Sequence, residues 1–234
     1  MTERARPWLR DQRRRLRRWW PPGRRRHVLG HLTPVSRAFG LDRGRAIDRF
    51  YIERFLTARA LDIRGAVLEV GDDTYARTFG GDRVTNRDVL HVKAGHPDAT
   101  LVADLSHTAD MPPDAYDCVI LTQTLQCILD VGVAIASVRR LLKPGCVVLA
   151  TVPGISHISR FDLDRWGEYW RFTTLSMRRL FEDAFPGNVS VDAYGNVLSA
   201  SAFLQGLAAE ELEREELEYR DPDYELVIVV RAVK

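Results

Sequence analysis

The sequence predicts an α/β protein with a doubly wound, mostly parallel sheet of seven strands. Apolar runs recur along residues 65–234, and most of them end in a polar turn. Helical patterns lie between these runs, which is the order that crossover helices give to parallel strands. The last run, residues 224–233, is almost continuously apolar and β-branched, as expected of a strand covered on both faces. Such a sheet binds its ligand at the carboxyl ends of the strands.

Seven apolar runs are expected to form the strands, and the last two are expected to pair as an antiparallel hairpin at one edge of the sheet. Glycine, proline and charged turns bound these runs and mark where each strand ends. The predicted strands cover residues 66–70, 88–92, 100–102, 116–121, 146–152, 189–193 and 224–233.

Five segments carry helical patterns, and the clearest is residues 45–60. Ile47, Tyr51 and Phe55 recur there at helical spacing, which predicts an amphipathic helix packed on the sheet. Its charged residues are most simply a solvent-exposed face; the alternative is that the helix covers the ligand site and turns Asp48 or Tyr51 toward the ligand. The other predicted helices cover residues 75–79, 131–142, 174–185 and 197–212.

The N-terminal segment is strongly basic. Residues 1–30 hold eleven Arg against Glu3 and Asp11, a balance of +9, so the rest of the chain carries −7 within a total of +2. Trp and Leu side chains among these Arg are typical of a helix that lies on an anionic membrane surface, which would make residues 1–26 a membrane contact. A mobile, solvated tail is the alternative, and nucleic-acid binding is disfavoured because no nucleic-acid motif is visible. The expected organisation is a basic arm (1–30), a helical cap (31–64) and an α/β domain (65–234).

The cysteines and the hydropathy pattern indicate the compartment. Cys118, Cys127 and Cys146 include no CxxC pair and lie among apolar neighbours, so we expect thiols in a reducing compartment rather than disulfides or metal ligands. No run approaches the ~20 apolar residues of a membrane span, and the N-terminus lacks the apolar core of a signal peptide. The sequence favours a cytoplasmic protein, with peripheral attachment to the inner membrane face as an alternative that the arm leaves open.

Polar residues follow the first, third and fourth predicted strands, in the segments VLEVG, ATLVADL and YDCVILTQTLQCILDV. Together with LLKPGCVVLATVP, this order resembles a class I S-adenosylmethionine-dependent methyltransferase over roughly residues 45–234. The segments GDDTY and DRWGEYWRFT resemble a bacterial branch often found beside glycosyltransferases. The resemblance implies a Rossmann-like methyltransferase fold and S-adenosylmethionine as the cofactor.

The resemblance also implies a set of cofactor-binding residues. Glycine at position 71 would let the backbone approach the methionine end of the cofactor, and the carboxylates beside it would meet the α-ammonium group. His91 stands where the family has an acidic residue for the ribose, Asp104 where it binds the adenine amino group, and the Leu105 backbone would read the ring edge. The expected cofactor residues are Glu69, Gly71, Asp72, Asp73, Thr74, His91, Asp104, Leu105, Thr122, Gln123 and Leu125.

Two departures from the family pattern concern this site. The glycine-rich turn keeps one glycine of three, because Asp73 and Tyr75 stand in place of the others. A histidine at position 91 can hydrogen-bond one ribose hydroxyl but cannot chelate two as a carboxylate does. Either the cofactor binds in a modified pose, or the fold has kept its shape and lost its ligand.

The irregular segment 153–172 is expected to form a lid that carries the catalytic and acceptor-binding groups. His157 is the first candidate for a general base and Asp162 the second. Aromatic and Arg side chains could hold a sugar ring by stacking and an anion by bidentate contacts. The alternative is that these side chains only cover the sheet edge, with Arg171 paired to Asp162 or Glu168. The expected acceptor residues are Arg160, Trp166, Tyr169, Trp170 and Arg171.

The function that these residues favour is O- or N-methyl transfer to a small-molecule acceptor, such as a sugar or a natural-product intermediate. The alternative is a catalytically silent, methyltransferase-like module that binds or scaffolds a partner, with or without a membrane contact through the arm. No metal is expected, because no His, Cys or Asp group has the spacing of metal ligands. The sequence does not indicate an oligomeric state.

Overall fold

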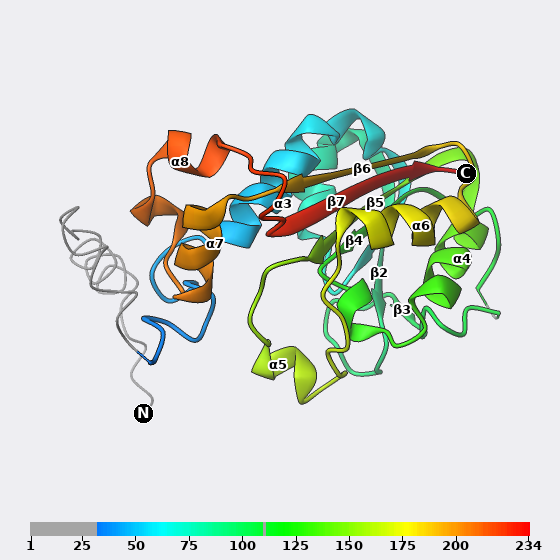
Figure 1. The fold of residues 1–234 in the computed structure, drawn as a ribbon. Coiled ribbons are helices and arrows are strands. Elements are labelled where there is room, and N and C mark those ends of the chain that lie inside the picture. Colours follow the sequence, from blue (N-terminus) through cyan, green and yellow to red (C-terminus); the bar gives the residue numbers. More distant parts are fainter. Residues whose placement is uncertain (1–31, 110) are drawn as a thin grey trace, which may run out of the picture. The chain divides into compact units, whose positions relative to one another are not determined.

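The computed structural model describes residues 32–109 and 111–234, and its centre is one seven-stranded sheet (Figure 1). The strand order is β3-β2-β1-β4-β5-β7-β6, with β1 to β5 parallel and β7 antiparallel to both of its neighbours. This order confirms the doubly wound fold and its antiparallel edge pair. The strands are β1 (Gly65–Val70), β2 (Val84–His91), β3 (Leu101–Val102), β4 (Tyr116–Thr122), β5 (Leu142–Pro153), β6 (Val189–Tyr194) and β7 (Val227–Val233).

The chain divides into two compact units. The sheet unit comprises Ile52–Tyr194 and Glu225–Lys234, and the described residues of the other unit are 32–51 and Gly195–Tyr224. Residues 195–224, which the sequence places in the α/β domain, therefore group with residues 32–51. Helix α3 (Ile47–Ala58) begins in one unit and ends in the other, close to the bounds that the sequence predicts.

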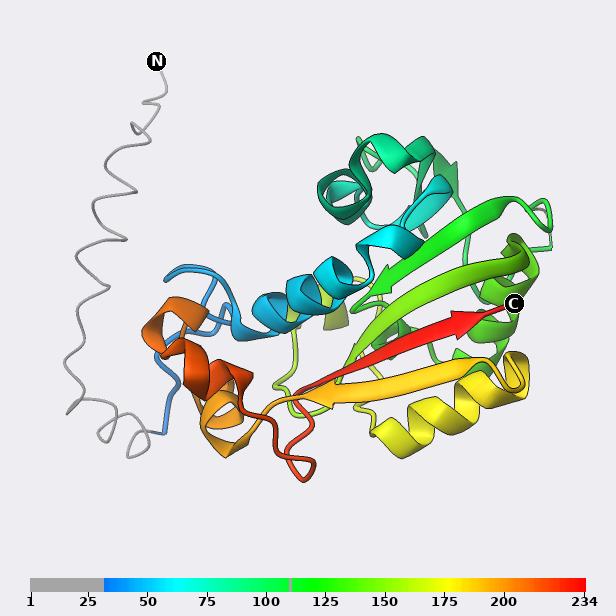
Figure 2. The same cartoon turned by 90° about the horizontal axis from the view of Figure 1, so that it is seen from above.

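Helices α4 (Val131–Leu141) and α6 (Thr174–Ala184) cover one face of the sheet with a single apolar core. Figure 2 shows α6 beside β6. Helix α6 begins at Thr173, whose side chain accepts a hydrogen bond from the Ser176 backbone in a capping box. Phe181 of α6 is fully buried against the sheet, and burial of one such side chain stabilises the fold by roughly 1.5–3 kcal/mol.

The short helix expected at residues 75–79 is a π-helical turn, Ala76–Gly80. It lies after the turn that follows β1 and is continued by a 3₁₀ turn, Gly81–Arg83, which leads into β2. Strand β2 starts four residues before its predicted start, because Val84, Asn86 and Arg87 already pair with β1.

One predicted helix is wrong in the second unit. Residues 197–212 do not form one helix but α7 (Val197–Leu204), a 3₁₀ turn (Ala209–Glu211) and, further on, α8 (Arg214–Glu218). Gly206 ends the first helix with φ of +71°, and a β-carbon there would lie 2.1 Å from the Ser36 carbonyl oxygen. Only glycine can approach the Ser36 backbone this closely, and its positive φ does not continue the helix, so α7 ends just before it.

Several sequence-based expectations concern the N-terminal segment and the cysteines. The arm of residues 1–30, with its membrane contact at residues 1–26, lies outside the described residues. In the part of the chain that the structure describes, no helix is long and apolar enough to cross a membrane. The three cysteines carry free thiols, as expected.

Candidate active site

The carboxyl ends of β1, β2, β3 and β4 lie along one edge of the sheet and bring the predicted cofactor residues together. Backbone hydrogen bonds continue the strand ladders past the strand ends. Gly71 N donates to Leu90 O (3.1 Å), and Ala103 N donates to His91 O (3.1 Å). Gln123 N donates to the Thr151 carbonyl of β5 (2.9 Å). The ends of β1, β2 and β3 are therefore hydrogen-bonded to one another, and the turn after β4 is hydrogen-bonded to β5.

The turn after β1 is open beside Gly71. This glycine has φ of +97°, in the left-handed region that other residues rarely adopt. A β-carbon built on Gly71 would meet no atom of the described residues within 4 Å. Neither Asp73 nor Tyr75, the residues that replace the family's other glycines, fills that position.

The acidic residues of this turn are largely engaged with their neighbours. Asp72 accepts a hydrogen bond from the Thr74 backbone (2.8 Å). Asp73 forms ion pairs with Arg77 and with Arg87 of β2, the latter at 3.3 Å. Asp73 therefore lies in a cluster with two guanidinium groups, which the sequence did not predict. The cluster borders a polar pocket of about 350 Å³ lined by Asp73, Arg77, Thr85, Asn86, Arg87, Val89, Asp98 and Thr100.

Glu69 is buried below the turn with 2% of its surface exposed. Its Oε1 accepts from the Tyr75 backbone (3.2 Å) and its Oε2 from the Ala76 backbone (2.8 Å). Burial raises the pKa of Glu69 to about 8, against the effect of these two hydrogen bonds, which favour the ionised form. The contacts of Glu69 therefore fix the turn that follows Gly71.

His91 ends β2 and lies half-buried against the β2–β3 loop. Its Nδ1 is 2.9 Å from the Lys93 carbonyl and 3.2 Å from the Lys93 backbone nitrogen. Its ring stacks on His96, with centroids 4.6 Å apart and planes 16° apart. Sequence reasoning missed His96, because a histidine in the turn GHPD carries no periodic signal.

Asp104 follows β3 with 48% of its side chain exposed. Its Oδ1 accepts from the Ser106 backbone (2.7 Å), and its Oδ2 lies 3.8 Å from His107 Nδ1. The Asp104 side chain therefore remains partly accessible at the carboxyl ends of the strands. The neighbouring Leu105 is 4% exposed, with its side chain in the apolar core.

Gln123, after β4, has a backbone conformation that is rare for residues other than glycine, with φ of +48°. Such conformations are concentrated at functional sites, where the surrounding structure maintains them. Gln126 stabilises this one by donating from Nε2 to the Gln123 carbonyl (2.8 Å). Gln123 Nε2 and Gln126 Oε1 are buried without a hydrogen-bond partner in the described part of the chain. Thr122 ends the strand beside them, and Leu125 is fully buried in the core.

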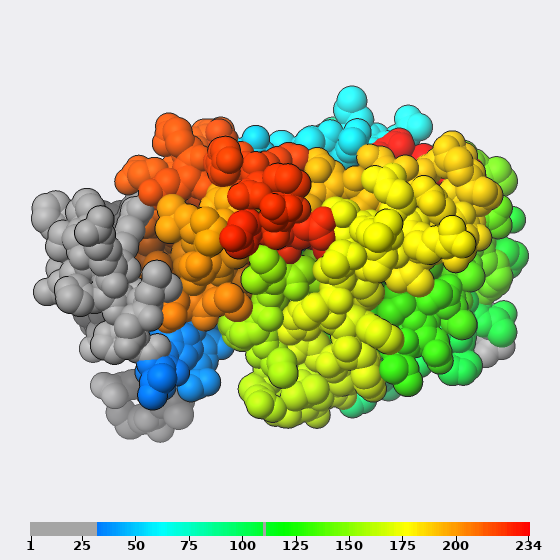
Figure 3. All heavy atoms as spheres, viewed as in Figure 1, coloured from blue at the N-terminus to red at the C-terminus, as the bar shows by residue number. Residues whose placement is uncertain are grey.

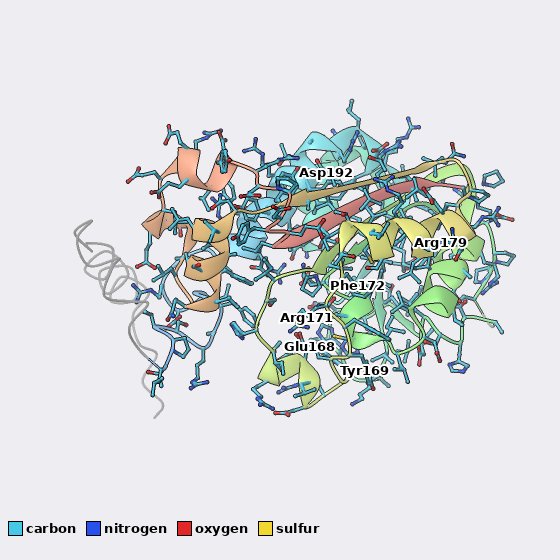
Figure 4. The ribbon with its side chains drawn as sticks, viewed as in Figure 1. Glu168, Tyr169, Arg171, Phe172, Arg179 and Asp192 are labelled. Carbon is cyan, nitrogen blue, oxygen red and sulfur yellow. The ribbon has the colours of Figure 1, made fainter. Side chains whose placement is uncertain are left out.

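The lid segment 153–172 contains a short helix, α5 (Arg160–Leu163), and forms part of the molecular surface in Figure 3. An ion pair holds its base, with Arg171 Nη2 2.9 Å from Glu168 Oε1 (Figure 4). The guanidinium also donates to the carbonyls of Ser156 (3.3 Å) and His157 (2.7 Å). Of the two partners considered for Arg171, Glu168 is therefore the one present. Arg171 joins the two ends of the lid.

The aromatic residues of the lid contact two different segments of the chain. Tyr169 N donates to Gln126 O (2.8 Å), and Trp170 Nε1 donates to Ile128 O (3.0 Å), so this end of the lid is attached to the segment after β4. The side chains of Tyr169 and Trp170 remain 52% and 40% exposed. Trp166 lies edge-on to the His91 ring, with centroids 5.9 Å apart.

The candidate bases lie at the start of the lid. His157 Nδ1 is 3.0 Å from the Ile158 carbonyl oxygen, which can only accept, so Nδ1 donates in this contact. Asp162 lies in the first turn of α5, where its backbone donates to the Ser159 cap (3.3 Å). Arg160 is the exposed first residue of the same helix.

Comparison with known proteins identifies the domain. Residues 58–150 match the family model described as "Methyltransferase domain", a segment that includes β1 to β4 and the site edge. This segment is similar to a methyltransferase domain, and the sheet has the Rossmann-like methyltransferase fold. This match confirms the resemblance seen in the sequence, and it supports S-adenosylmethionine as the cofactor of the domain.

Solved structures share the fold of this chain at low sequence identity. The [4+2]-cyclase SpnF is 17% identical, with 89% of this chain and 90% of that chain covered and a TM-score of 0.53. A methyltransferase from Archaeoglobus fulgidus is 10% identical (80% and 94% covered, TM-score 0.52). One from Mesorhizobium loti is 15% identical (81% and 98% covered, TM-score 0.50). No curated protein sequence matches the chain.

Proposed function

We propose that this domain transfers the methyl group of S-adenosylmethionine to an oxygen or nitrogen atom of a small-molecule acceptor, such as a sugar or a natural-product intermediate. The open position beside Gly71 is the observation that carries the proposal. A β-carbon there would meet no described atom within 4 Å, and the backbone keeps a φ of +97°. Ligand entry is therefore sterically allowed where the family binds the methionine end of its cofactor.

The edge of the sheet offers a separate polar group to each part of the cofactor. Asp72 would meet the α-ammonium group, His91 a ribose hydroxyl and Asp104 the adenine amino group. Thr122 and Gln123 would line the methionine portion, where the buried Gln123 Nε2 gains an acceptor for its N–H groups. When bound, S-adenosylmethionine supplies a methyl group on a positively charged sulfur.

The protein's contribution to the reaction is alignment, exclusion of water and removal of one proton. Alignment of the acceptor atom with the methyl group lowers the barrier because the encounter no longer costs translational and rotational entropy. His157, at the start of the lid, is the proposed base, and its Nδ1 is directed to the Ile158 carbonyl. Asp162 is the second candidate. General-base catalysis contributes roughly 10² to 10⁴ to the rate for a hydroxyl acceptor.

The acceptor would bind on the lid. The exposed faces of Tyr169 and Trp170 suit stacking on a sugar ring. Arg160 is available to bind an anionic group, whereas Arg171 already makes contacts that hold the lid together. A catalytically silent binding module is not favoured, because the turn beside Gly71 is open and the strained Gln123 backbone is retained.

Ligand-dependent stabilisation of the full chain tests this function. The unfolding midpoint is measured by thermal shift with S-adenosylmethionine, with S-adenosylhomocysteine, and with ATP as a control that has the adenosine moiety but not the methionine. A ligand at about 100 times its Kd stabilises the native state by about 2.7 kcal/mol. We expect a rise with the two sulfur ligands and none with ATP. No rise with either sulfur ligand at saturating concentration would overturn the proposal.

A further inference from the structure

The lid contacts the proposed cofactor edge at His91. Trp166 lies edge-on to the His91 ring at 74°, and His96 stacks on the same imidazole. Lys93 Nζ donates to the Arg165 carbonyl (2.9 Å), which is a second link between the β2–β3 loop and the lid. The orientation of the His91 ring therefore depends on a residue more than seventy positions further along the chain.

Trp166 is itself held in place by the lid. Phe161 packs against it at 70° with centroids 5.7 Å apart, and the Arg165 guanidinium lies 3.6 Å above the Phe161 ring. His96, His91, Trp166 and Phe161 thus form a continuous series of ring contacts, which we call the ring series. Aromatic pairs stabilise a structure beyond the area that they bury, so the ring series restrains the imidazole without a covalent link.

The hydrogen bonds of His91 determine which ring atom serves a ligand. Nδ1 faces the backbone of Lys93, whose N–H can donate to it and whose carbonyl can accept from it. Nε2 is therefore the ring nitrogen for a ligand. A hydroxyl both donates and accepts, so either neutral tautomer of His91 can bind one through Nε2. Because one nitrogen makes one such bond, its strength depends on the angle of the ring.

We propose that Trp166 is a positioning residue for the cofactor: through the ring series it holds His91 Nε2 toward a ribose hydroxyl of the adenosyl group. This role replaces the stacking contact with a sugar acceptor that the sequence suggested for Trp166. The inference rests on the proposed function. It makes the lid part of the cofactor site as well as the acceptor site.

The test measures the Kd of S-adenosylhomocysteine for the full chain by calorimetry. Trp166→Leu removes the edge contact to His91, and Trp166→Phe keeps a ring there. Leu175→Ala is the control, since Leu175 is 76% exposed on α6 and belongs to neither site. We expect Trp166→Leu to weaken binding about 3- to 10-fold, the factor that corresponds to one aromatic pair. Trp166→Phe is expected to restore most of the affinity, and Leu175→Ala to leave it unchanged.

A second ligand separates positioning from general loosening of the lid. An S-adenosylhomocysteine analogue without the two ribose hydroxyls cannot use His91 Nε2. Trp166→Leu is therefore expected to change its Kd less than twofold, and to have no further effect in a His91→Ala background. Equal weakening of both ligands, or no weakening of either, overturns the inference while the proposed function stands. If the wild-type chain does not bind S-adenosylhomocysteine, the proposed function fails and this inference fails with it.

Discussion

Arg171 and Glu168 form an ion pair at the base of the lid, with Nη2 2.9 Å from Oε1. The Glu168 side chain is 4% exposed, and its Oε2 accepts from the Ser159 backbone (2.8 Å). The pair thus connects the residues before α5 with those after it. A charge in this position requires its partner, because an unpaired buried carboxylate is strongly disfavoured.

Replacement of Arg171 by Met is expected to destabilise the lid. Glu168 would lose its counter-charge, and removal of one partner of a buried pair costs roughly 3–5 kcal/mol; since the Arg171 side chain is 27% exposed, we expect about 1–3 kcal/mol. Hydrogen exchange of residues 156–171 measures the destabilisation of the lid, and urea unfolding measures the change in the free energy of unfolding of the whole fold. Arg160→Met, at an exposed lid arginine, serves as the control. Equal exchange in the two variants would contradict the role of the pair.

The carboxyl of Glu69 is expected to make stability depend on pH. Its pKa is raised to about 8 by burial, so the native state holds a proton that the unfolded state releases near pH 4.5. The stabilisation from this proton is fully present below pH 4.5 and is lost as the pH rises through 8. Between these values the free energy of unfolding should fall by up to about 1.4 kcal/mol per pH unit.

Glu69→Gln isolates the contribution of Glu69 protonation to stability, because glutamine has the same shape and does not titrate. The free energy of unfolding of the variant, measured in urea from pH 5 to 9, should lack the slope that Glu69 adds to the wild type. Parallel curves for the two proteins would show that Glu69 is ionised throughout and that its two backbone hydrogen bonds outweigh its burial.

Asp104 is expected to contribute to cofactor affinity through its partly accessible side chain. Asp104→Ala should weaken S-adenosylhomocysteine binding by about 1–3 kcal/mol, because a polar ring group loses its acceptor. Asp183→Ala on α6 is the matched control, since that carboxylate is 70% exposed and pairs with Arg179. Calorimetric Kd values check the expectation. An Asp104 variant that binds like the Asp183 variant would place the adenine pocket elsewhere.

The sequence predicted the parallel sheet well because buried strands have continuous apolar runs. It missed the first half of β2, where Asn86 and Arg87 are polar and pair with β1 all the same. It also joined α7 to the residues after it, because contact between Gly206 and the Ser36 backbone is not visible in local periodicity.

The sequence could predict which residues of the candidate site lie near one another only where the ends of strands determine their positions. Gly71, His91, Asp104 and Gln123 come together because parallel strands share one carboxyl edge. The contacts within the site depend on side-chain directions and on pairs distant in sequence. The sequence therefore did not predict the Asp73 cluster, the φ of Gln123 or the contact between Trp166 and His91.

Gly71 and Gly145 allow a matched comparison for the central claim. Both have positive φ, +97° and +76°, and at both a β-carbon would meet no described atom within 4 Å. Gly71 follows the carboxyl end of β1, whereas Gly145 lies near the start of β5, among the amino ends of the parallel strands. Valine therefore causes backbone strain of the same kind at either position, but only at residue 71 would it meet the cofactor.

Calorimetric titration of Gly71→Val and Gly145→Val with S-adenosylhomocysteine is the most direct measurement. We predict that Gly145→Val binds like the wild type and that Gly71→Val shows no binding, with both variants folded by circular dichroism. Wild-type affinity in a folded Gly71→Val variant would show that the turn after β1 does not face the cofactor, and would contradict the proposed site.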